Sequence, residues 1–248
     1  RSSIVRRRSI CFARLKRNPV GGPGITYVNP MSTGVAYALI ERGTRDKIPV
    51  FTLGYGRADA SDGRVFPYVF PLMTNYWSQV SAKIRYIAQK VGGEDKLKGV
   101  KIANLHLDHP YGAETKFILD AMSKKLGFEV KHYPVAVPGI DQKSLWLDIA
   151  RNYKADFVIN RNWGVSCTVP LKEAARLGFP ADRIIGVWWC GSEEDVIPAG
   201  ADKLVFALAP MVVFAAALAA YVIIPFGPNL IVRDLNIGVL FYISISSL

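Results

Sequence analysis

The chain has 248 residues, half of them hydrophobic, which is enough for a sizeable core and excludes disorder throughout. Its formal net charge is +11, but residues 1–17 hold seven of the 31 basic residues and no acidic one. The body of the chain is therefore nearly balanced, and because no nucleic-acid motif follows the basic stretch, we expect no nucleic-acid partner.

Residues 1–24 are expected to form a basic N-terminal extension. The apolar stretch after the arginines at 6–8 reaches only from Ser9 to Ala13, which is too short for the hydrophobic region of a secretion signal. The three cysteines (Cys11, Cys167 and Cys190) are widely spaced and form no CxxC pair. They indicate neither a disulfide framework nor a zinc site, and we expect ordinary core or surface thiols.

From residue 25 onwards, short β-rich apolar runs alternate with longer amphipathic stretches, as in βαβ units around a parallel sheet. The strands are expected at 27–29, 48–53, 65–72, 100–107, 128–137, 157–160 and 184–189. The helices are expected at 32–41, 76–91, 110–126, 144–153 and 169–177. The hydroxyls of Ser32 and Thr33 suit a helix N-cap, and a glycine follows three of the other helices. This repetition predicts a doubly wound parallel α/β fold.

The composition changes after Lys203. Residues 204–224 carry no charge and are interrupted only by Pro210, which is the length needed to cross a bilayer of about 30 Å. A second apolar run begins at residue 237 and is twelve residues long. The pattern favours a membrane-type helix at 204–224 over a buried core helix, because it has no polar stripe.

His106, Asp108 and His109 are the nearest approach to a metal site in the sequence, because His106 and Asp108 would face one side of a strand. No HExxH motif and no second carboxylate at ligand spacing accompany them, so no metal is predicted. Gly54-Tyr55-Gly56 does not complete a dinucleotide fingerprint, and no Walker lysine or GxSxG elbow is present. We therefore predict no cofactor and no catalytic residue.

Hydroxyl and aromatic residues recur where the predicted strands end. In an open α/β sheet the carboxyl ends of the strands form the edge where ligands bind. Rings and helix N-termini at that edge can enclose a small solute. The candidate ligand-binding residues are Ser32, Thr33, Tyr55, Gly56, Tyr111, Trp163 and Trp188, with Trp189 beside the last.

Several segments resemble the branched-chain amino acid type of ABC-transporter substrate-binding proteins over about residues 25–198. They are residues 34–43, 47–52, 107–112, 155–159 and 171–178. The resemblance implies a type I periplasmic binding protein-like fold, in which an incomplete pair of lobes closes on a solute by hinge motion. It also implies delivery to an ABC permease, a periplasmic location and no catalysis. By position, Ser32 matches a hydroxyl that binds the ligand carboxylate and Tyr111 a ring that covers the ligand.

Two positions depart from that family. Tyr55-Gly56 stands where a small residue and Thr are usual, and Trp188-Trp189 stands where an acid commonly pairs with the ligand's α-ammonium. A related amide, an aromatic acid or another small organic solute therefore fits as well as a branched-chain amino acid.

The tail, about residues 198–248, resembles a membrane subunit (H) of bacterial complex I, the NADH-quinone oxidoreductase. The segments that carry this likeness are 198–210, 222–228 and 234–238. The two likenesses meet near 193–200, which indicates a chimera. The alternative function is thus a fragment of a respiratory subunit in the bacterial inner membrane, with membrane association through residues 204–224.

Overall fold

The computed structural model describes residues 11–16, 24–191 and 193–200. The chain divides into two compact units, residues 1–79 and 80–248. Helix α3 (Tyr76–Val91) begins in the first unit and continues through the second.

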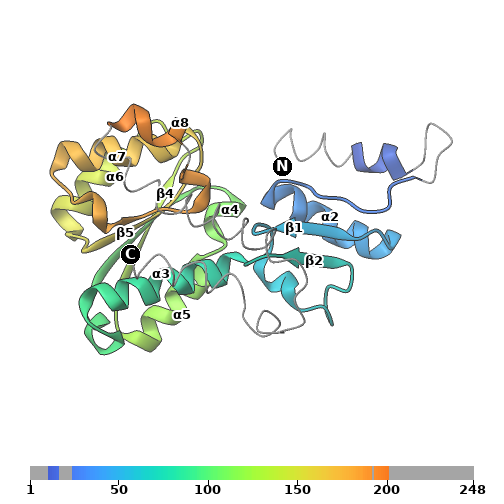
Figure 1. Ribbon diagram of the computed structural model, residues 1–248, viewed down its shortest axis with the longest axis horizontal. Coiled ribbons are helices and arrows are strands. Elements are labelled where there is room, and N and C mark those ends of the chain that lie inside the picture. The colour runs from blue at the N-terminus through green and yellow to red at the C-terminus, as the bar shows by residue number, and fades with distance from the viewer. Residues whose placement is uncertain (1–10, 17–23, 192, 201–248) are drawn as a thin grey trace, which may run out of the picture. The chain divides into compact units, whose positions relative to one another are not determined.

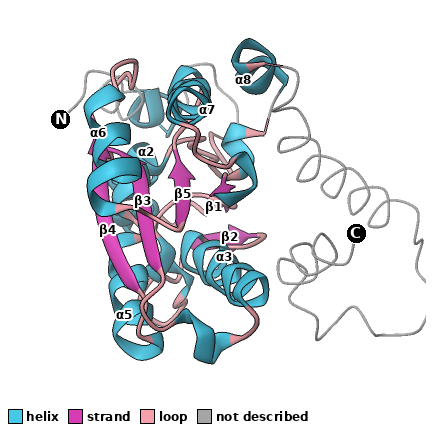
Figure 2. Cartoon of the chain, turned by 90° about the vertical axis from the view of Figure 1, so that its left-hand side faces the viewer, coloured by secondary structure: helices cyan, strands magenta, loops and turns pink. Residues whose placement is uncertain are grey.

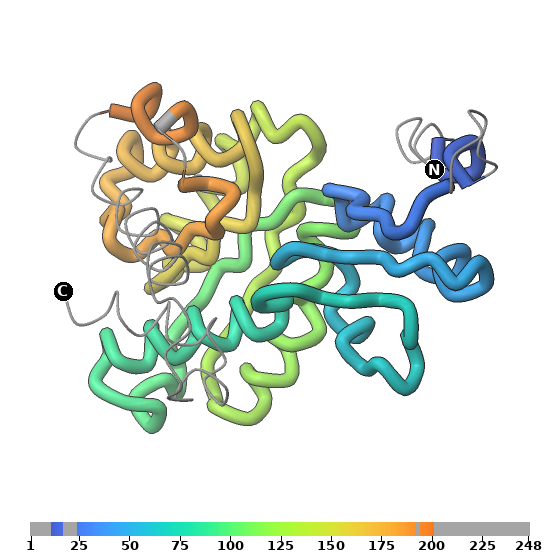
Figure 3. Tube along the Cα trace, turned by 45° about the vertical axis from the view of Figure 1, so that its right-hand side comes forward, coloured from blue at the N-terminus to red at the C-terminus, as the bar shows by residue number. Residues whose placement is uncertain are grey.

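The first unit contains a small parallel sheet and one long helix. Its elements are α2 (Thr33–Asp46), β1 (Val50–Leu53), a 3-10 turn (Ala58–Ser61) and β2 (Val69–Leu72). Strands β1 and β2 pair in parallel and run side by side in Figure 3, while Val28 forms a single bridge to Val50. The strand predicted at 65–72 therefore forms only in its second half.

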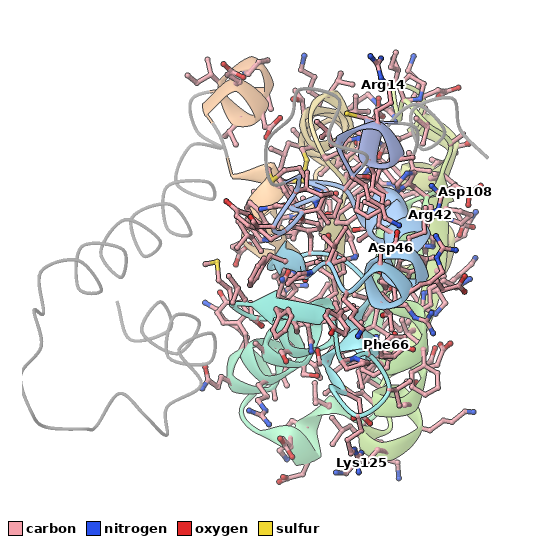
Figure 4. All side chains as sticks on the ribbon, turned by 90° about the vertical axis from the view of Figure 1, so that its right-hand side faces the viewer. Arg14, Arg42, Asp46, Phe66, Asp108 and Lys125 are labelled. Carbon is pink, nitrogen blue, oxygen red and sulfur yellow. A yellow bond between two sulfur atoms is a disulfide. The ribbon has the colours of Figure 1, made fainter. Side chains whose placement is uncertain are left out.

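Helix α2 holds this unit together through its apolar face. Val35 and Leu39 pack with Ile48 and with Phe12, which comes from a helical turn at 11–16. Lys16 of that turn forms an ion pair with Asp46, which Figure 4 labels near the end of α2. This contact with Lys16 is the main cause that lowers the pKa of Asp46. The N-terminal segment therefore contributes to the core of the first unit.

The second unit is built on a four-stranded, fully parallel sheet in the order β4-β3-β5-β6 (Figure 2). The strands are β3 (Lys101–Leu107), β4 (Glu129–Val135), β5 (Phe157–Arg161) and β6 (Ile184–Ile185). The helices after α3 are α4 (Pro110–Ala113), α5 (Lys116–Leu126), α6 (Lys143–Leu147), α7 (Val165–Leu177) and α8 (Glu193–Val196). A π-helical turn (Asp148–Tyr153) follows α6, and 3-10 turns lie at Glu94–Leu97, Ala181–Arg183, Trp188–Cys190 and Ile197–Ala199.

Helices cover both faces of this sheet (Figure 1). Helices α3 and α5 lie on one side, and α6 and α7 lie on the other. The core under α3 and α5 joins Ile84, Ile87 and Leu119 to Ile102 and Ile159 of the strands. The α/β class with a parallel sheet is therefore confirmed.

Further element predictions were wrong in detail. The helix expected at 110–126 is two helices, α4 and α5. The strand expected at 184–189 ends at Ile185, and a 3-10 turn follows at Trp188. Helix α7 begins at Val165 rather than 169, so Pro170 lies inside it. Ser32 occupies the N-cap position of α2 but its side chain makes no capping hydrogen bond.

The membrane-type segment predicted at 204–224 lies outside the described residues, as does the apolar run from 237. Within the part of the chain that is described, no helix is both long enough and apolar enough to span a bilayer.

Candidate functional site

In the first unit, the site residues predicted from sequence lie around the carboxyl end of β1. Thr33 begins α2 and is 2 % exposed. Its Oγ1 accepts a hydrogen bond from the backbone N–H of Gly56 (3.4 Å) and lies 3.1 Å from the hydroxyl of Tyr76. The backbone of Gly56 has a φ of 102°, which favours glycine. The hydroxyl of Thr33 therefore fixes the turn after β1 to the start of α2.

The hydroxyl of Tyr55 also binds other parts of the first unit. Its ring is buried, and its hydroxyl donates a hydrogen bond to Oδ1 of Asn29. The same hydroxyl accepts from the backbone N–H of Met31 at 2.8 Å. Tyr55 thus holds the segment before α2 in place. Ser32, in contrast, is only half-buried.

In the second unit, three rings pack together where β3 and β5 end. Tyr111 of α4 stacks on Trp163, with ring centroids 5.4 Å apart and planes 9° from parallel. The ring centroid of His109 lies 5.2 Å from that of Trp163. His109 also caps α4, because its Nδ1 accepts from the backbone N–H of Tyr111 at 3.2 Å. Burial lowers the pKa of His109, which favours the neutral ring that this bond requires.

Trp163 is the exposed member of this aromatic group. It is 37 % exposed, whereas Tyr111 is 1 % exposed. Ser166 fixes its backbone, since the hydroxyl donates to the carbonyl of Trp163 at 2.6 Å and lies 3.2 Å from its N–H. The rigid ring at this edge is therefore Trp163, and Tyr111 supports it from beneath.

Arg161, the last residue of β5, supports Tyr111 in turn. Its guanidinium carbon lies 4.5 Å from the centroid of the Tyr111 ring, within the range of a cation–π interaction. Its Nε donates to the carbonyl of Tyr111 at 3.2 Å. The hydroxyl of Tyr111 donates to the carbonyl of Asn162 at 3.0 Å. Both ends of the tyrosine are thereby fixed.

Gly112 makes the position of Tyr111 possible. A Cβ at residue 112 would lie 2.0 Å from the carbonyl oxygen of Leu107, so only glycine fits there. The start of α4 can therefore lie directly against the end of β3, which places Tyr111 at the sheet edge.

A disulfide joins Cys167 of α7 to Cys190, with 5.3 Å between their Cα atoms. The prediction of ordinary thiols was wrong for these two, because α7 lies against the turn after β6, a contact that spacing alone does not reveal. Cys11 is a free thiol. The turn that the disulfide secures carries Trp188 and Trp189, whose stacked rings have centroids 3.6 Å apart. Trp188 is 44 % exposed.

The residues weighed for a metal site have other contacts. His106 is buried, which lowers its pKa, and its Nδ1 lies 3.0 Å from the carbonyl of Leu107. Asp108 lies at the surface, as Figure 4 shows. Among the described residues, no group of three or more His, Cys, Asp or Glu side chains could hold a metal ion.

The structure thus brings Tyr111 together with Trp163, and Thr33 together with Gly56, each pair within one unit. Sequence reasoning missed Arg161 and the structural role of His109. The signal was present, because a charged residue directly after the strand predicted at 157–160 is unusual at a buried position.

The sheets of both units are parallel, which places the chain in the α/β class. A family model described as periplasmic binding protein matches residues 24–219. This chain belongs to the periplasmic binding protein family.

The chain is also similar to solved structures of ABC transporter proteins. The chain is 48% identical to a protein described as an ABC transporter permease from the Pseudomonas fluorescens group, with a TM-score of 0.72, covering 80% of this chain and 48% of that one. It shares its fold with a branched-chain amino acid ABC transporter from Thermus thermophilus with bound valine, at 21% identity, a TM-score of 0.67 and coverage of 80% and 49%. The chain thus spans about half the length of these proteins.

A separate, short likeness is to the same membrane subunit (H) of NADH-quinone oxidoreductase, from Rhodospirillum centenum. It is 47% identical over 55 residues, which are 22% of this chain and 16% of that protein. The similarity to both families is therefore confirmed, although the second covers a small part of the chain.

Proposed function

We propose that this chain is part of the substrate-binding component of an ABC importer. It binds a small organic solute at the carboxyl edges of its parallel sheets, by closure of two lobes and without catalysing a reaction. Its partner is an ABC permease and its location is the periplasm. Family membership and the 48% identity to an ABC transporter protein support this proposal.

The observation that carries the proposal is the aromatic group of His109, Trp163 and Tyr111. An exposed, rigid indole at the carboxyl edge of a parallel sheet provides a flat apolar surface for a solute. Ser166 binds the backbone of Trp163, and the Tyr111 ring stacks on its indole. Little side-chain entropy is therefore lost when a solute packs against the indole.

In the first unit we assign Ser32 and the backbone of Gly56 to solute binding. Ser32 lies at the N-terminus of the 14-residue helix α2, where N–H groups and the helix dipole favour an anion. Thr33 and Tyr55 support these groups from the interior. We also assign Trp188, which is 44 % exposed, to solute binding in the second unit.

The test is ligand-dependent thermal stabilisation of the protein with a panel of amino acids, aromatic acids and amides. At least one member should raise the Tm of the wild type. Trp163→Ala should weaken its binding at least about tenfold, the size expected for a rigid aromatic contact. Leu147→Ala removes a half-exposed apolar side chain on α6, outside the aromatic group, and should bind like the wild type.

Two results would overturn the proposal. One is that no solute in the panel raises the Tm of wild-type protein. The other is that Trp163→Ala and Leu147→Ala weaken binding equally.

The second candidate is the respiratory one, and its support is the 55-residue match to NADH-quinone oxidoreductase. That match covers 16% of the matched protein. We propose that the apolar segment 204–224 provides membrane association in a chimeric chain. Flotation of the full chain with lipid vesicles tests this, and a chain that stays unbound at the bottom of the gradient contradicts it.

A further inference from the structure

The turn after β6 carries an exposed indole on a very short strand. Strand β6 has two residues, which pair with β5. The 3-10 turn that follows, Trp188–Cys190, is closed by a hydrogen bond from the N–H of Cys190 to the carbonyl of Val187 at 2.7 Å. The indole of Trp188 is 44 % exposed. Pairing with the sheet alone therefore gives this turn little support.

Two neighbouring residues of α7 hold the segment after β6. The disulfide joins Cys167 to Cys190, the last residue of the turn, and both cysteines are buried. The Sγ atom of Cys167 lies 3.8 Å from the carbonyl oxygen of Trp189. The hydroxyl of Thr168 donates a hydrogen bond to the carbonyl of Asp195 at 2.7 Å. The first turn of α7 thus supplies the support that the short strand does not.

The disulfide also adjoins the loop that carries Trp163. The Sγ atom of Cys190 lies 3.3 Å from the carbonyl oxygen of Asn162, the residue before Trp163. The hydroxyl of Tyr111 donates to that same carbonyl at 3.0 Å. Because β5 and β6 are neighbouring parallel strands, Trp163 and Trp188 both follow strand ends at one edge of the sheet. The disulfide therefore connects the two loops that carry these exposed indoles.

The two loops differ in how much they depend on the disulfide. The hydroxyl of Ser166 donates to the carbonyl of Trp163, and the ring of Tyr111 stacks on the indole. The side-chain amide of the fully buried Gln142 donates to the carbonyl of Ser166 at 3.2 Å. These contacts fix Trp163 without the sulfur atoms. Loss of the disulfide should therefore displace Trp188 and leave Trp163 in place.

We propose that Cys167 and Cys190 are positioning residues for solute binding, whose disulfide holds the indole of Trp188 where one solute contacts both it and Trp163. The inference rests on the proposed function. A ring that is fixed before binding gives more affinity than a mobile one, because ordering a loop and its side chain costs free energy. An indole offers mainly apolar contact area, so the pair fits a solute with an aromatic ring or a branched alkyl group.

A double-mutant cycle on the full chain tests whether the disulfide acts through Trp188. The probes are benzoate, phenylacetamide and leucine, and titration calorimetry uses the one that wild type binds most tightly. Trp188→Ala should weaken binding about tenfold, the size of an aromatic contact. Cys167→Ala with Cys190→Ala should weaken it about fivefold. In the Trp188→Ala background the same two replacements should change Kd by less than about twofold, because the indole that they position is gone.

Two controls separate positioning from a general loss of structure. In a Trp163→Ala background, removal of the disulfide should still weaken binding about fivefold, since other contacts hold Trp163. Cys11→Ala removes the exposed free thiol and should bind like the wild type. A purely structural role of the disulfide would weaken binding by the same factor in the wild-type, Trp188→Ala and Trp163→Ala backgrounds.

Hydrogen–deuterium exchange provides a readout that needs no solute. Without the disulfide, the amides of residues 186–191 should exchange at least about fivefold faster, because local opening of the turn becomes easier. Residues 162–166 should keep their wild-type exchange. If the two alanines prevent folding, Cys167→Val with Cys190→Ala takes their place, because it fills more of the space of the sulfur atoms.

The inference is overturned if Trp188→Ala binds the probe as tightly as the wild type, or if loss of the disulfide has an equal effect with and without Trp188. In both cases the probe still binds, and the proposed function stands. If no probe raises the Tm of the wild type, exchange alone decides. Unchanged exchange of residues 186–191 would then show that the disulfide does not position this turn.

Discussion

The carboxyl edges of the two units use similar residues in opposite ways. In the first unit, Thr33 and Tyr55 are buried, and their hydroxyls bind the chain itself. In the second unit, Tyr111 is buried but its partner Trp163 remains exposed. A residue at a strand end is therefore either a support or a contact surface, and its type alone does not distinguish the two.

The two edges also differ in charge. The second unit places the guanidinium of Arg161 against the ring of Tyr111, whereas in the first unit the hydroxyl of Tyr55 binds the amide of Asn29 and a backbone N–H.

The largest effect is expected from the disulfide, which secures only the edge of the second unit. Cys167 and Cys190 are 23 residues apart, and replacing both with Ala should lower the free energy of unfolding by about 3 kcal/mol, the size of the loop-closure effect. Denaturant unfolding with and without reductant measures it. Replacing the exposed Cys11 with Ala is the control, and equal losses in the two variants would contradict the assignment.

Lys83 allows a second test, through pH. Because its pKa is lowered in the folded protein, the unfolded chain binds more protons between that lowered pKa and the ordinary value of 10.5. The free energy of unfolding should rise with pH in this window by up to about 1.4 kcal/mol per pH unit. Lys83→Met lacks this slope and should be more stable than the wild type at pH 7, with an advantage that shrinks towards pH 10.

Urea unfolding of both proteins at pH 7 and pH 9.5 measures this difference. Lys90→Met, at an exposed position, should follow the wild type at both pH values. A constant difference between Lys83→Met and the wild type would show that the amine is not desolvated in the folded state.

The smallest effect is expected in the first unit. Tyr55→Phe removes the hydroxyl that binds Asn29 and Met31, and should cost about 1 kcal/mol of stability, the usual size for a buried hydrogen bond. Affinity for the solute should change less than it does in Trp163→Ala. Tyr27→Phe, at a 60 % exposed position, provides the control in thermal unfolding. A strong loss of affinity with unchanged Tm would make Tyr55 a contact residue instead.

The alternation of strands and helices could be predicted from sequence because apolar periodicity reports which side of an element is buried. The element boundaries that were predicted wrongly depend on the local backbone conformation. Pro170 is accommodated inside α7, and Trp188 lies in a 3-10 turn after a strand of two residues. Neither conformation produces a periodic pattern of apolar residues in the sequence.

The location of the candidate site at the carboxyl edge of the sheet could be predicted from sequence. The contacts between its side chains could not. Tyr111 and Trp163 are far apart in sequence, and only the parallel pairing of β3 with β5 brings them together. The pairing of Cys167 with Cys190 needs the same kind of knowledge. Sequence spacing carries no information about which loops meet at a sheet edge.

Gly112 sets a limit for any redesign of the aromatic edge in the second unit. Since residue 112 has no room for a Cβ beside the carbonyl of Leu107, a library can vary the exposed Trp163 but should leave position 112 untouched. Variants that alter it would lose the platform on which every new specificity depends.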